Sequence, residues 1–477
     1  MASSGARDST ATPCIEIKRL DPGVVNRTYD YPGLAKGTKV LVVGDGAVGD
    51  SARSLLKAAG CQVTALCTAA TAAATTGCLA VEGSPTSPDA CVKAVAGQEV
   101  VVHAGGPSCA AEARECVTSG TRNLLEAAAV AGVKGFVFAS SVSVVSGGKT
   151  SKAISEDTPY PTRNVDPAAA ALAEAERLVL RANATNAADG MLTCSVRAAP
   201  VYGPGESERL IPGLACRAKA GVRAIGDGSN VVDFVYSGNV AHALILAAQR
   251  LLSPAQPAAA AVAAAAVAAA AQTASAATGR AYFVTDVEPV PYGEFAGRAL
   301  SRLGYPAPGS GGSAGAIPVA LALALAFLLR VAALVVSPIF ELRPALTARR
   351  VSEESEVRRF DTSRAREELG YAPRWTQDEA LDITLHSALA LRNPLAKLKY
   401  VGPFSEAEVA RHSTEDDAWI IVSGKVYDVT PYLDQHPGGD ALLRNVGADS
   451  TEGMHGPQHP AQAMEILEQH FIGHLET

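Results

Sequence analysis

Three closely spaced glycines after a run of aliphatic residues could bind the diphosphate of a dinucleotide. The run spans residues 39–43, Gly44, Gly46 and Gly49 follow it, and residues 50–59 have the pattern of a helix. Glycine lets the backbone turn tightly and approach a pyrophosphate, which the positive end of a helix dipole attracts. An ordinary strand–helix turn carries the same spacing, so the motif needs support from the rest of the chain.

The segments that follow this turn alternate between strand-like and helix-like patterns. Residues 62–67, 98–107 and 133–141 have the composition of buried strands, whereas residues 120–132 have the pattern of an amphipathic helix. This alternation predicts an α/β fold with a parallel, doubly wound sheet. Ligands of such sheets bind at the carboxyl ends of the strands, where the glycine turn lies.

Length and composition predict more than one domain. The 477 residues exceed what one hydrophobic core usually organises. The net charge of −7 argues against a nucleic-acid-binding protein. Residues 401–477 hold three Lys or Arg, thirteen Asp or Glu and six of the nine histidines, which indicates a domain boundary near residue 400.

The nine cysteines show no CxxC spacing, which favours a reducing compartment. Residues 1–36 have no apolar signal-peptide core and are expected to form a loose leader.

Seven further segments share the residue patterns of one family. They are residues 120–123, 136–144, 196–205, 210–213, 226–236, 239–242 and 360–373. With the glycine turn, they make residues 37–395 resemble the extended short-chain dehydrogenase/reductases. More narrowly, they resemble the 3β-hydroxysteroid dehydrogenases, including the sterol-4α-carboxylate 3-dehydrogenases. The resemblance implies a Rossmann-type sheet and NAD or NADP as the cofactor.

The resemblance also implies which residues contact this cofactor. They are Gly44, Gly46, Gly49, Cys67, His103, Ala104, Gly105 and Ser140. Cys67 stands where an acidic residue would accept the adenosine ribose hydroxyls, and no arginine follows to bind a 2′-phosphate, so NAD and NADP both remain open. Ser84 and Val117 depart from the aspartate and asparagine that the family leads one to expect.

The reaction implied by the resemblance is hydride transfer from a 3β-hydroxyl carbon to the nicotinamide. In the family a tyrosine takes the hydroxyl proton, a lysine four residues later lowers its pKa, and a serine bonds the substrate oxygen. Ser141 occupies the serine position, but Ala168 and Leu172 occupy the other two. Tyr160 is the nearest alternative tyrosine, in a predicted loop with Asn164 four residues later. Two interpretations of this domain therefore remain open: a dehydrogenase with altered acid–base chemistry, and an inactive scaffold that binds nucleotide or sterol.

Three segments of unusual composition fall in the second half of this region. Residues 253–278 are expected to be a low-complexity, alanine-rich insertion, and residues 309–313 form a glycine- and serine-rich joint. Residues 316–336 are apolar except for Arg330 and could just span a bilayer. They are interpreted either as a buried helix lining the sterol pocket or, as the resemblance favours, as a membrane-associated helix.

Residues 401–477 form the second predicted domain. From residue 403 they resemble cytochrome b5, with a strand–turn–strand pattern at residues 419–430. The resemblance implies an α+β domain that binds haem b, with His436 and His459 as the axial ligands of the iron. Two axial imidazoles leave the iron no open position, so it would transfer electrons.

His455 is the rival to His459 as an axial ligand, because it lies only four residues earlier. The other histidines of this domain are expected at its surface, namely His412, His470 and His474. The acidic excess would steer a basic electron-transfer partner such as a flavin reductase. Together the two resemblances predict a membrane-associated redox protein on the cytosolic face of the endoplasmic reticulum, acting on a sterol or other lipid-like substrate.

Overall fold

The computed structural model describes most of residues 31–475. The described residues are 31, 34–67, 77–105, 113–146, 153–161, 167–184, 190–205, 210–219, 224–252, 278–286, 289–303, 305, 317–336, 346–390, 402–415, 417–436, 439–456, 459, 461–468 and 470–475. The predicted joint at residues 309–313 and all of the predicted insertion except Thr278 lie outside them. The chain divides into two compact units, one mainly of residues 22–297 and 307–384, the other containing residues 385–477.

A seven-stranded parallel sheet forms the centre of the first unit. Its strands, in the order β10-β6-β5-β4-β1-β2-β3, are β1 (Lys39–Val43), β2 (Gln62–Cys67), β3 (Leu79–Glu82), β4 (Val100–His103), β5 (Gly135–Ser141), β6 (Leu192–Ala198) and β10 (Ala281–Val284). All adjacent pairs are parallel. A parallel sheet is covered on both faces, which explains its nearly continuous valine-rich strands. The predicted doubly wound α/β fold is confirmed.

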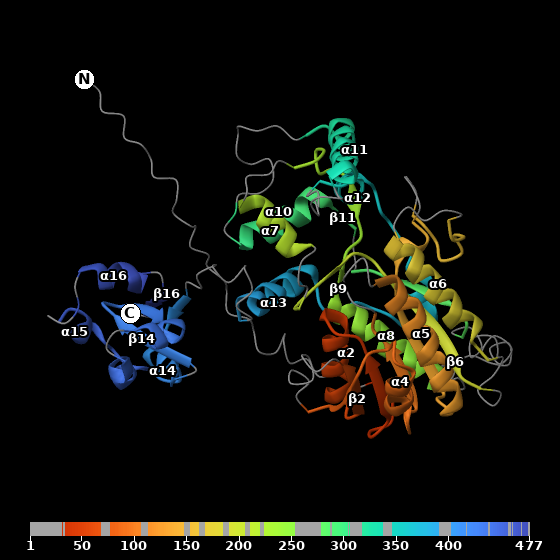
Figure 1. Ribbon diagram of the computed structural model, residues 1–477, viewed down its shortest axis with the longest axis horizontal. Helices are drawn as coiled ribbons and strands as arrows, with labels where there is room; N and C mark the ends of the chain where they lie inside the picture. The colour runs from red at the N-terminus through yellow and green to blue at the C-terminus, as the bar shows by residue number, and fades with distance from the viewer. Residues whose placement is uncertain are drawn as a thin grey trace, which may run out of the picture. The chain divides into compact units, whose positions relative to one another are not determined.

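Helices cover both faces of this sheet (Figure 1). α2 (Ala47–Ala58) and α8 (Ser237–Leu252) pack on one face, and α4 (Pro88–Val95), α5 (Ala113–Val130) and α6 (Pro167–Arg181) pack on the other. Leu124 and Val179 join Phe136 and Phe138 in the core of the second face. α2 begins earlier than the predicted residue 50, because the chain becomes helical directly after Gly46.

Shorter elements complete this part of the chain. They are η1 (Val142–Val144), β7 (Val201–Tyr202), α7 (Ile211–Lys219), β8 (Val231–Val232), β9 (Val235–Tyr236), β11 (Val290–Pro291), α10 (Tyr292–Arg302), α11 (Val319–Val336), α12 (Ala348–Ser355), η2 (Ala365–Leu369) and α13 (Gln377–Ala390). Asp286 links β7 to α8, because it accepts hydrogen bonds from the Tyr202 hydroxyl at 2.8 Å and the Asn239 amide at 2.7 Å. Burial raises the pKa of Asp286 to about 6.

The end of the predicted leader packs against the first unit. Tyr31 and Leu34 are buried, and the Tyr31 hydroxyl lies 2.9 Å from Nδ1 of His242 in α8. The expectation of a loose segment therefore does not hold at Tyr31 and Leu34. Residues 1–30 lie outside the described part of the chain.

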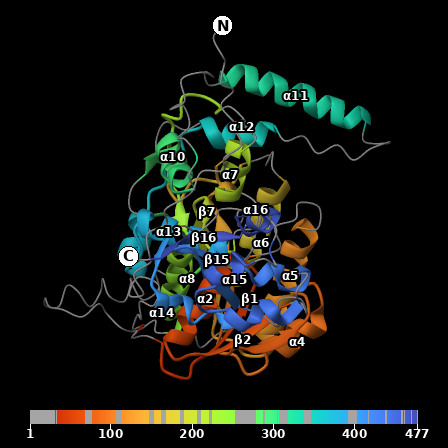
Figure 2. The same ribbon diagram turned by 90° about the vertical axis from the view of Figure 1, so that its left-hand side faces the viewer.

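Helix α11 exposes its large apolar side chains. It lies along α12, at the end of this unit opposite β2 and α4 (Figure 2). Ala322 and Ala326 are buried, whereas Leu321, Phe327 and Leu328 are 59%, 65% and 63% exposed. The interpretation as a buried helix is therefore wrong for these leucine and phenylalanine side chains. Among the described residues, no helix has the length and hydropathy needed to cross a membrane.

The second unit contains a five-stranded sheet with short helices. Its strands, in the order β12-β16-β15-β14-β13, are β12 (Gly402–Phe404), β13 (Ser413–Thr414), β14 (Asp417–Val422), β15 (Lys425–Asp428) and β16 (Phe471–Leu475). The helices are α14 (Glu406–Val409), η4 (Thr430–Gln435), η5 (Gly439–Asn445), α15 (Thr451–Met454) and α16 (Ala461–Glu468). Leu433, Leu442, Met454 and Met464 from the helices pack on a buried cluster of the sheet. This is the predicted α+β class.

Candidate dinucleotide and haem sites

The glycine turn between β1 and α2 has the geometry that a dinucleotide diphosphate requires. Gly44 and Gly46 have φ values of +122° and +124°, which side-chain-bearing residues rarely adopt. A Cβ atom at Gly49 would lie 2.2 Å from the Gly44 carbonyl oxygen, so only glycine allows this close packing. A Cβ atom at Gly46 would meet no atom within 4 Å. The turn thus leaves open space beside the N-terminus of α2, where a phosphate would be attracted.

The predicted contacts at the ends of β4 and β5 lie on neighbouring strands beside this turn. The Ala104 amide donates to the Val43 carbonyl at 2.7 Å, and a Cβ atom at Gly105 would meet nothing within 4 Å. His103 is buried with Nε2 3.1 Å from the Thr121 hydroxyl, and burial lowers its pKa to about 4. The imidazole is therefore neutral at physiological pH. Ser140 is buried on β5, with no hydrogen-bond partner for its hydroxyl among the described residues.

The end of β2 carries no carboxylate, but the adjacent strand does. Cys67 is buried and pairs in register with Glu82, the last residue of β3. Glu82 is exposed at the same edge of the sheet. Its carboxylate could accept the ribose hydroxyls that Cys67 cannot accept. The sequence alone did not single out Glu82, because only strand register places it beside Cys67.

The three positions predicted for the catalytic groups lie on elements that pack against one another, β5 and α6. Ser141 ends β5, and its hydroxyl oxygen accepts hydrogen bonds from the Ser143 amide at 3.2 Å and the Ser143 hydroxyl at 3.0 Å. Ala168 and Leu172 lie one turn apart in α6, which packs on η1. Leu172 contacts the apolar cluster that includes Val142 and Val144 of η1. Neither a methyl nor an isobutyl group can transfer a proton.

Tyr160 does not replace the missing tyrosine. Its hydroxyl donates to Glu176 at 2.5 Å, and burial together with the Glu176 charge raises its pKa to about 12. Glu176 is fully buried and pairs with Arg197 at 2.7 Å, while the Ser195 hydroxyl donates to it at 2.9 Å. A raised pKa makes Tyr160 a poorer proton acceptor than an unperturbed tyrosine. Its role in this network is structural.

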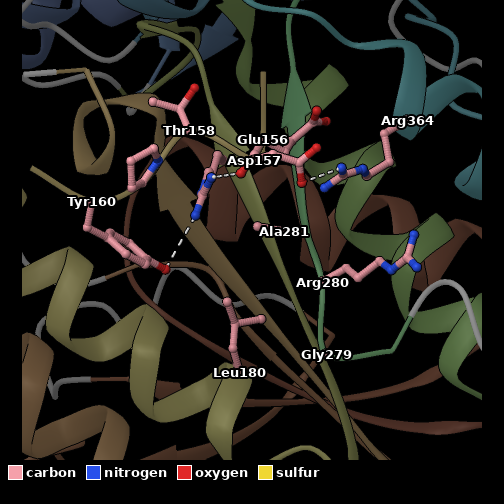
Figure 3. Close-up of a pocket in the computed structure, with 11 residues that line it drawn as sticks. Glu156, Asp157, Thr158, Tyr160, Leu180, Gly279, Arg280, Ala281 and Arg364 are labelled. Atoms are coloured by element: carbon pink, nitrogen blue, oxygen red, sulfur yellow. Dashed lines mark hydrogen bonds and ion pairs between the residues drawn. The ribbon is translucent and has the colours of Figure 1, made fainter. Parts of the chain in front are cut away.

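Tyr160 also borders a cavity of about 500 Å³ that is separate from the glycine turn (Figure 3). Tyr160 and Arg364 lie on opposite sides of it. The arginines that line it already have carboxylate partners, because Arg364 pairs with Asp157 at 2.7 Å and Arg280 pairs with Glu368 at 2.7 Å. No unpaired charge of these arginines is available to attract a ligand.

In the C-terminal unit, His436 and His459 face each other at a separation that suits a metal ion between them. Their ring centroids are 6.2 Å apart, and the ring planes are inclined by 37°. A metal bonded to both Nε2 atoms at about 2 Å requires a centroid separation of roughly 6.3 Å. Nδ1 of His459 lies 3.0 Å from the Gly453 carbonyl, which fixes this nitrogen as the donor and leaves Nε2 as the ligand atom. The two imidazoles and the separation of their rings fit a haem iron.

The other histidines of this unit lie elsewhere. His455 is exposed, and its Nε2 atom lies 3.1 Å from the Ser423 hydroxyl. His412 stacks on Trp419 with ring centroids 3.5 Å apart and bonds Asp417 at 2.7 Å. His474 is exposed, whereas the partly buried His470 packs near Tyr432.

Comparison with known proteins identifies both units. Residues 68–311, about half of the chain, match the 3-beta hydroxysteroid dehydrogenase/isomerase family. The chain belongs to this family. Residues 405–476 match the cytochrome b5-like heme/steroid binding domain. The predicted pairing of a sterol dehydrogenase-like domain with a cytochrome b5 domain is confirmed, and with it NAD(P) and haem as the cofactors that the two units imply.

Relatives of the 3-beta hydroxysteroid dehydrogenase family align mainly with the first unit. The chain is 34% identical over 303 residues to 3beta-hydroxysteroid-dehydrogenase/decarboxylase isoform 1 of Arabidopsis thaliana, covering 62% of this chain and 63% of that protein. It therefore spans less than two thirds of that relative. It is 34% identical over 275 residues to the decarboxylating sterol-4-alpha-carboxylate 3-dehydrogenase of Mus musculus, covering 57% and 68%.

A solved structure shares the fold of the first unit. The UDP-glucose 4-epimerase of Thermotoga maritima matches with a TM-score of 0.52 at 17% identity, covering 74% of this chain and 99% of that one. At this identity the likeness concerns the fold alone.

Proposed function

We propose that the first unit binds NAD or NADP together with a sterol and oxidises the sterol 3β-hydroxyl, with a sterol 4α-carboxylate as the substrate class. The family match carries this proposal, and the open space at the glycine turn supports it. The bound nicotinamide supplies the hydride acceptor. Ser141 would hydrogen-bond the substrate oxygen, and the neutral His103, Ala104, Gly105 and Ser140 would line the cofactor. With a 4α-carboxylate, the 3-ketone product is a β-keto acid that readily loses carbon dioxide.

Cofactor titration and turnover test this function directly. We expect the full-length protein to quench NADH or NADPH fluorescence and to reduce NAD or NADP slowly when a sterol 4α-carboxylate is added. Loss of a positioned base costs about 10²- to 10⁴-fold in rate, so turnover should fall below that of a relative with tyrosine and lysine by this factor. A protein that neither binds the nucleotides nor turns over would contradict the proposal.

A nucleotide- or sterol-binding scaffold is the second candidate function. The side chains of Ala168 and Leu172 favour it, because neither can accept the hydroxyl proton. The same experiment separates the two candidates. A scaffold binds the nucleotide or the sterol without any reduction of NAD or NADP, whereas the dehydrogenase shows both binding and slow reduction.

We further propose that the second unit binds haem b through His436 and His459 and carries electrons. The facing imidazoles and the family match support this role. The excess of ten acidic residues over basic residues in residues 401–477 would attract a basic partner such as a flavin reductase. The proposed domain limits are residues 37–395 for the dehydrogenase domain and 401–477 for the haem domain.

Membrane association is proposed for α11, at the cytosolic face of the endoplasmic reticulum. In this helix small alanines face the protein, whereas Leu321, Phe327 and Leu328 face outward. This is the reverse of the pattern that water-exposed helices show. A helix with this outward face lowers its free energy by placing the apolar side chains among lipid acyl chains.

Replacement of the three most exposed apolar side chains described in α11, Leu321, Phe327 and Leu328, by serine should release the protein from lipid. Burial of one such side chain contributes about 1.5–3 kcal/mol, so the vesicle partition coefficient should fall at least about 100-fold. Flotation with phospholipid vesicles measures this change. Leu79→Ser with Val130→Ser is the matched control, because both residues are exposed apolar side chains elsewhere in the same unit. Equal flotation of the triple variant and the wild type would contradict attachment through α11.

A further inference from the structure

Arg53 is a buried cation beside the glycine turn. Its side chain is only 6% exposed, although it projects from the second turn of α2. Nη1 donates to the Gly44 carbonyl at 2.9 Å, and Nη2 pairs with Asp50 at 2.5 Å. The guanidinium therefore folds back from the helix to the turn that precedes it.

The bond to Gly44 fixes the direction of one peptide group of the turn. The Gly44 carbonyl oxygen lies 2.2 Å from the position of a Cβ atom at Gly49, and Arg53 Nη1 lies 3.5 Å from the same position. This carbonyl thus points toward α2 and away from the open space beside Gly46. A carbonyl that turned outward would present negative charge to a bound phosphate, and Arg53 prevents this orientation.

The buried charge of Arg53 has an exposed carboxylate as a partner and lies near the N-terminal end of α2, where the helix dipole is already positive. Burial of a cation carries a further cost, which a nearby anion must offset. Asp50 supplies one negative charge, but its side chain is 61% exposed. A dinucleotide diphosphate at the turn would add two negative charges in the open space beside Gly46 and Gly105.

We propose that Arg53 is a positioning residue for the diphosphate of the nucleotide. It holds the Gly44 carbonyl away from the phosphates and adds positive potential beneath them, without contacting them. Asp50 opposes the second effect, because its carboxylate repels the same diphosphate. The inference rests on the proposed binding of NAD or NADP and adds a residue to that site.

Calorimetric titration of the full-length protein with ADP tests this role. Arg53→Met should weaken ADP binding about 10- to 100-fold, as expected for loss of a hydrogen bond and charge that act on an anion. Arg53→Lys keeps the charge and should give an intermediate loss. Asp50→Asn should tighten ADP binding several-fold, because it removes a repulsive charge. Lys57→Met is the matched control, since it removes an exposed cation from the far end of the same helix.

The opposite directions of the two effects distinguish positioning from a purely structural role. Weakening by Asp50→Asn equal to that by Arg53→Met would overturn the proposal, and so would unchanged ADP binding by a folded Arg53→Met protein. If Arg53→Met does not fold, the Arg53→Lys and Asp50→Asn proteins still test the proposal. It requires that Arg53→Lys weakens ADP binding and that Asp50→Asn tightens it. A wild-type protein that binds neither ADP nor NADH would instead overturn the proposed nucleotide binding itself.

Discussion

Alanine at either His436 or His459 should abolish the low-spin absorption bands of the haem-loaded protein. The two imidazoles face each other at 6.2 Å, so each would supply one axial bond to the iron. Removing one ligand opens a coordination position, which changes the spin state or releases the haem. Absorption spectra of the oxidised and reduced full-length protein measure the change, and haem content per chain distinguishes altered ligation from loss.

His455→Ala is the matched control for this experiment. The residue lies four positions before His459, yet it is exposed and its ring contacts Ser423. Its replacement should leave the low-spin bands unchanged. If His455→Ala abolishes these bands and His459→Ala does not, the ligand assignment is wrong.

Ala168→Tyr combined with Leu172→Lys should raise the rate of sterol oxidation about 10²- to 10⁴-fold. Both positions lie on one side of α6, which packs on β5 and on η1, the element that follows Ser141. A tyrosine there could accept the hydroxyl proton, and a lysine one turn later would lower its pKa. The rate of NADH or NADPH formation with a sterol 4α-carboxylate measures the gain.

Two variants separate recovered chemistry from improved packing. Ala168→Phe with Leu172→Met adds comparable bulk without a phenol or an amine and should not raise the rate. Ala168→Tyr alone should recover only part of the gain, because its pKa would stay high. A double variant that folds, binds NADH and remains as slow as the wild type would contradict the assignment of these positions.

The sheet and its glycine turn could be predicted because their signals are local. Runs of aliphatic residues that end in glycine identify β1 and β4, and the spacing between them indicates parallel pairing. The burial of Tyr31 could not be predicted in this way. A single aromatic residue in a polar segment has no periodicity, and its partner His242 lies 211 positions away.

In the candidate sites, too, some features could be predicted from local sequence and others depend on contacts in the folded chain. The positions of Ala168 and Leu172 followed from register, whereas the contribution of Arg53 depends on a side chain that folds back toward Gly44. Residues 320–325 alternate alanine and leucine, a pattern with no helical periodicity. The sequence therefore could not predict which face of α11 points outward. The preference for His459 over His455, in contrast, followed from the family resemblance, and in the structure it is the His459 ring that lies 6.2 Å from the His436 ring.

The opposed imidazoles of the second unit limit how the two units can cooperate. A metal with both axial positions filled accepts electrons singly, because no position remains for a hydride or a substrate. The sterol oxidation proposed for the first unit would remove two electrons together, as a hydride. On these two proposals, the haem iron could not accept a hydride directly from the sterol or from the reduced nicotinamide. Electron transfer between the two cofactors would then require a further group that accepts a hydride and releases its electrons one at a time.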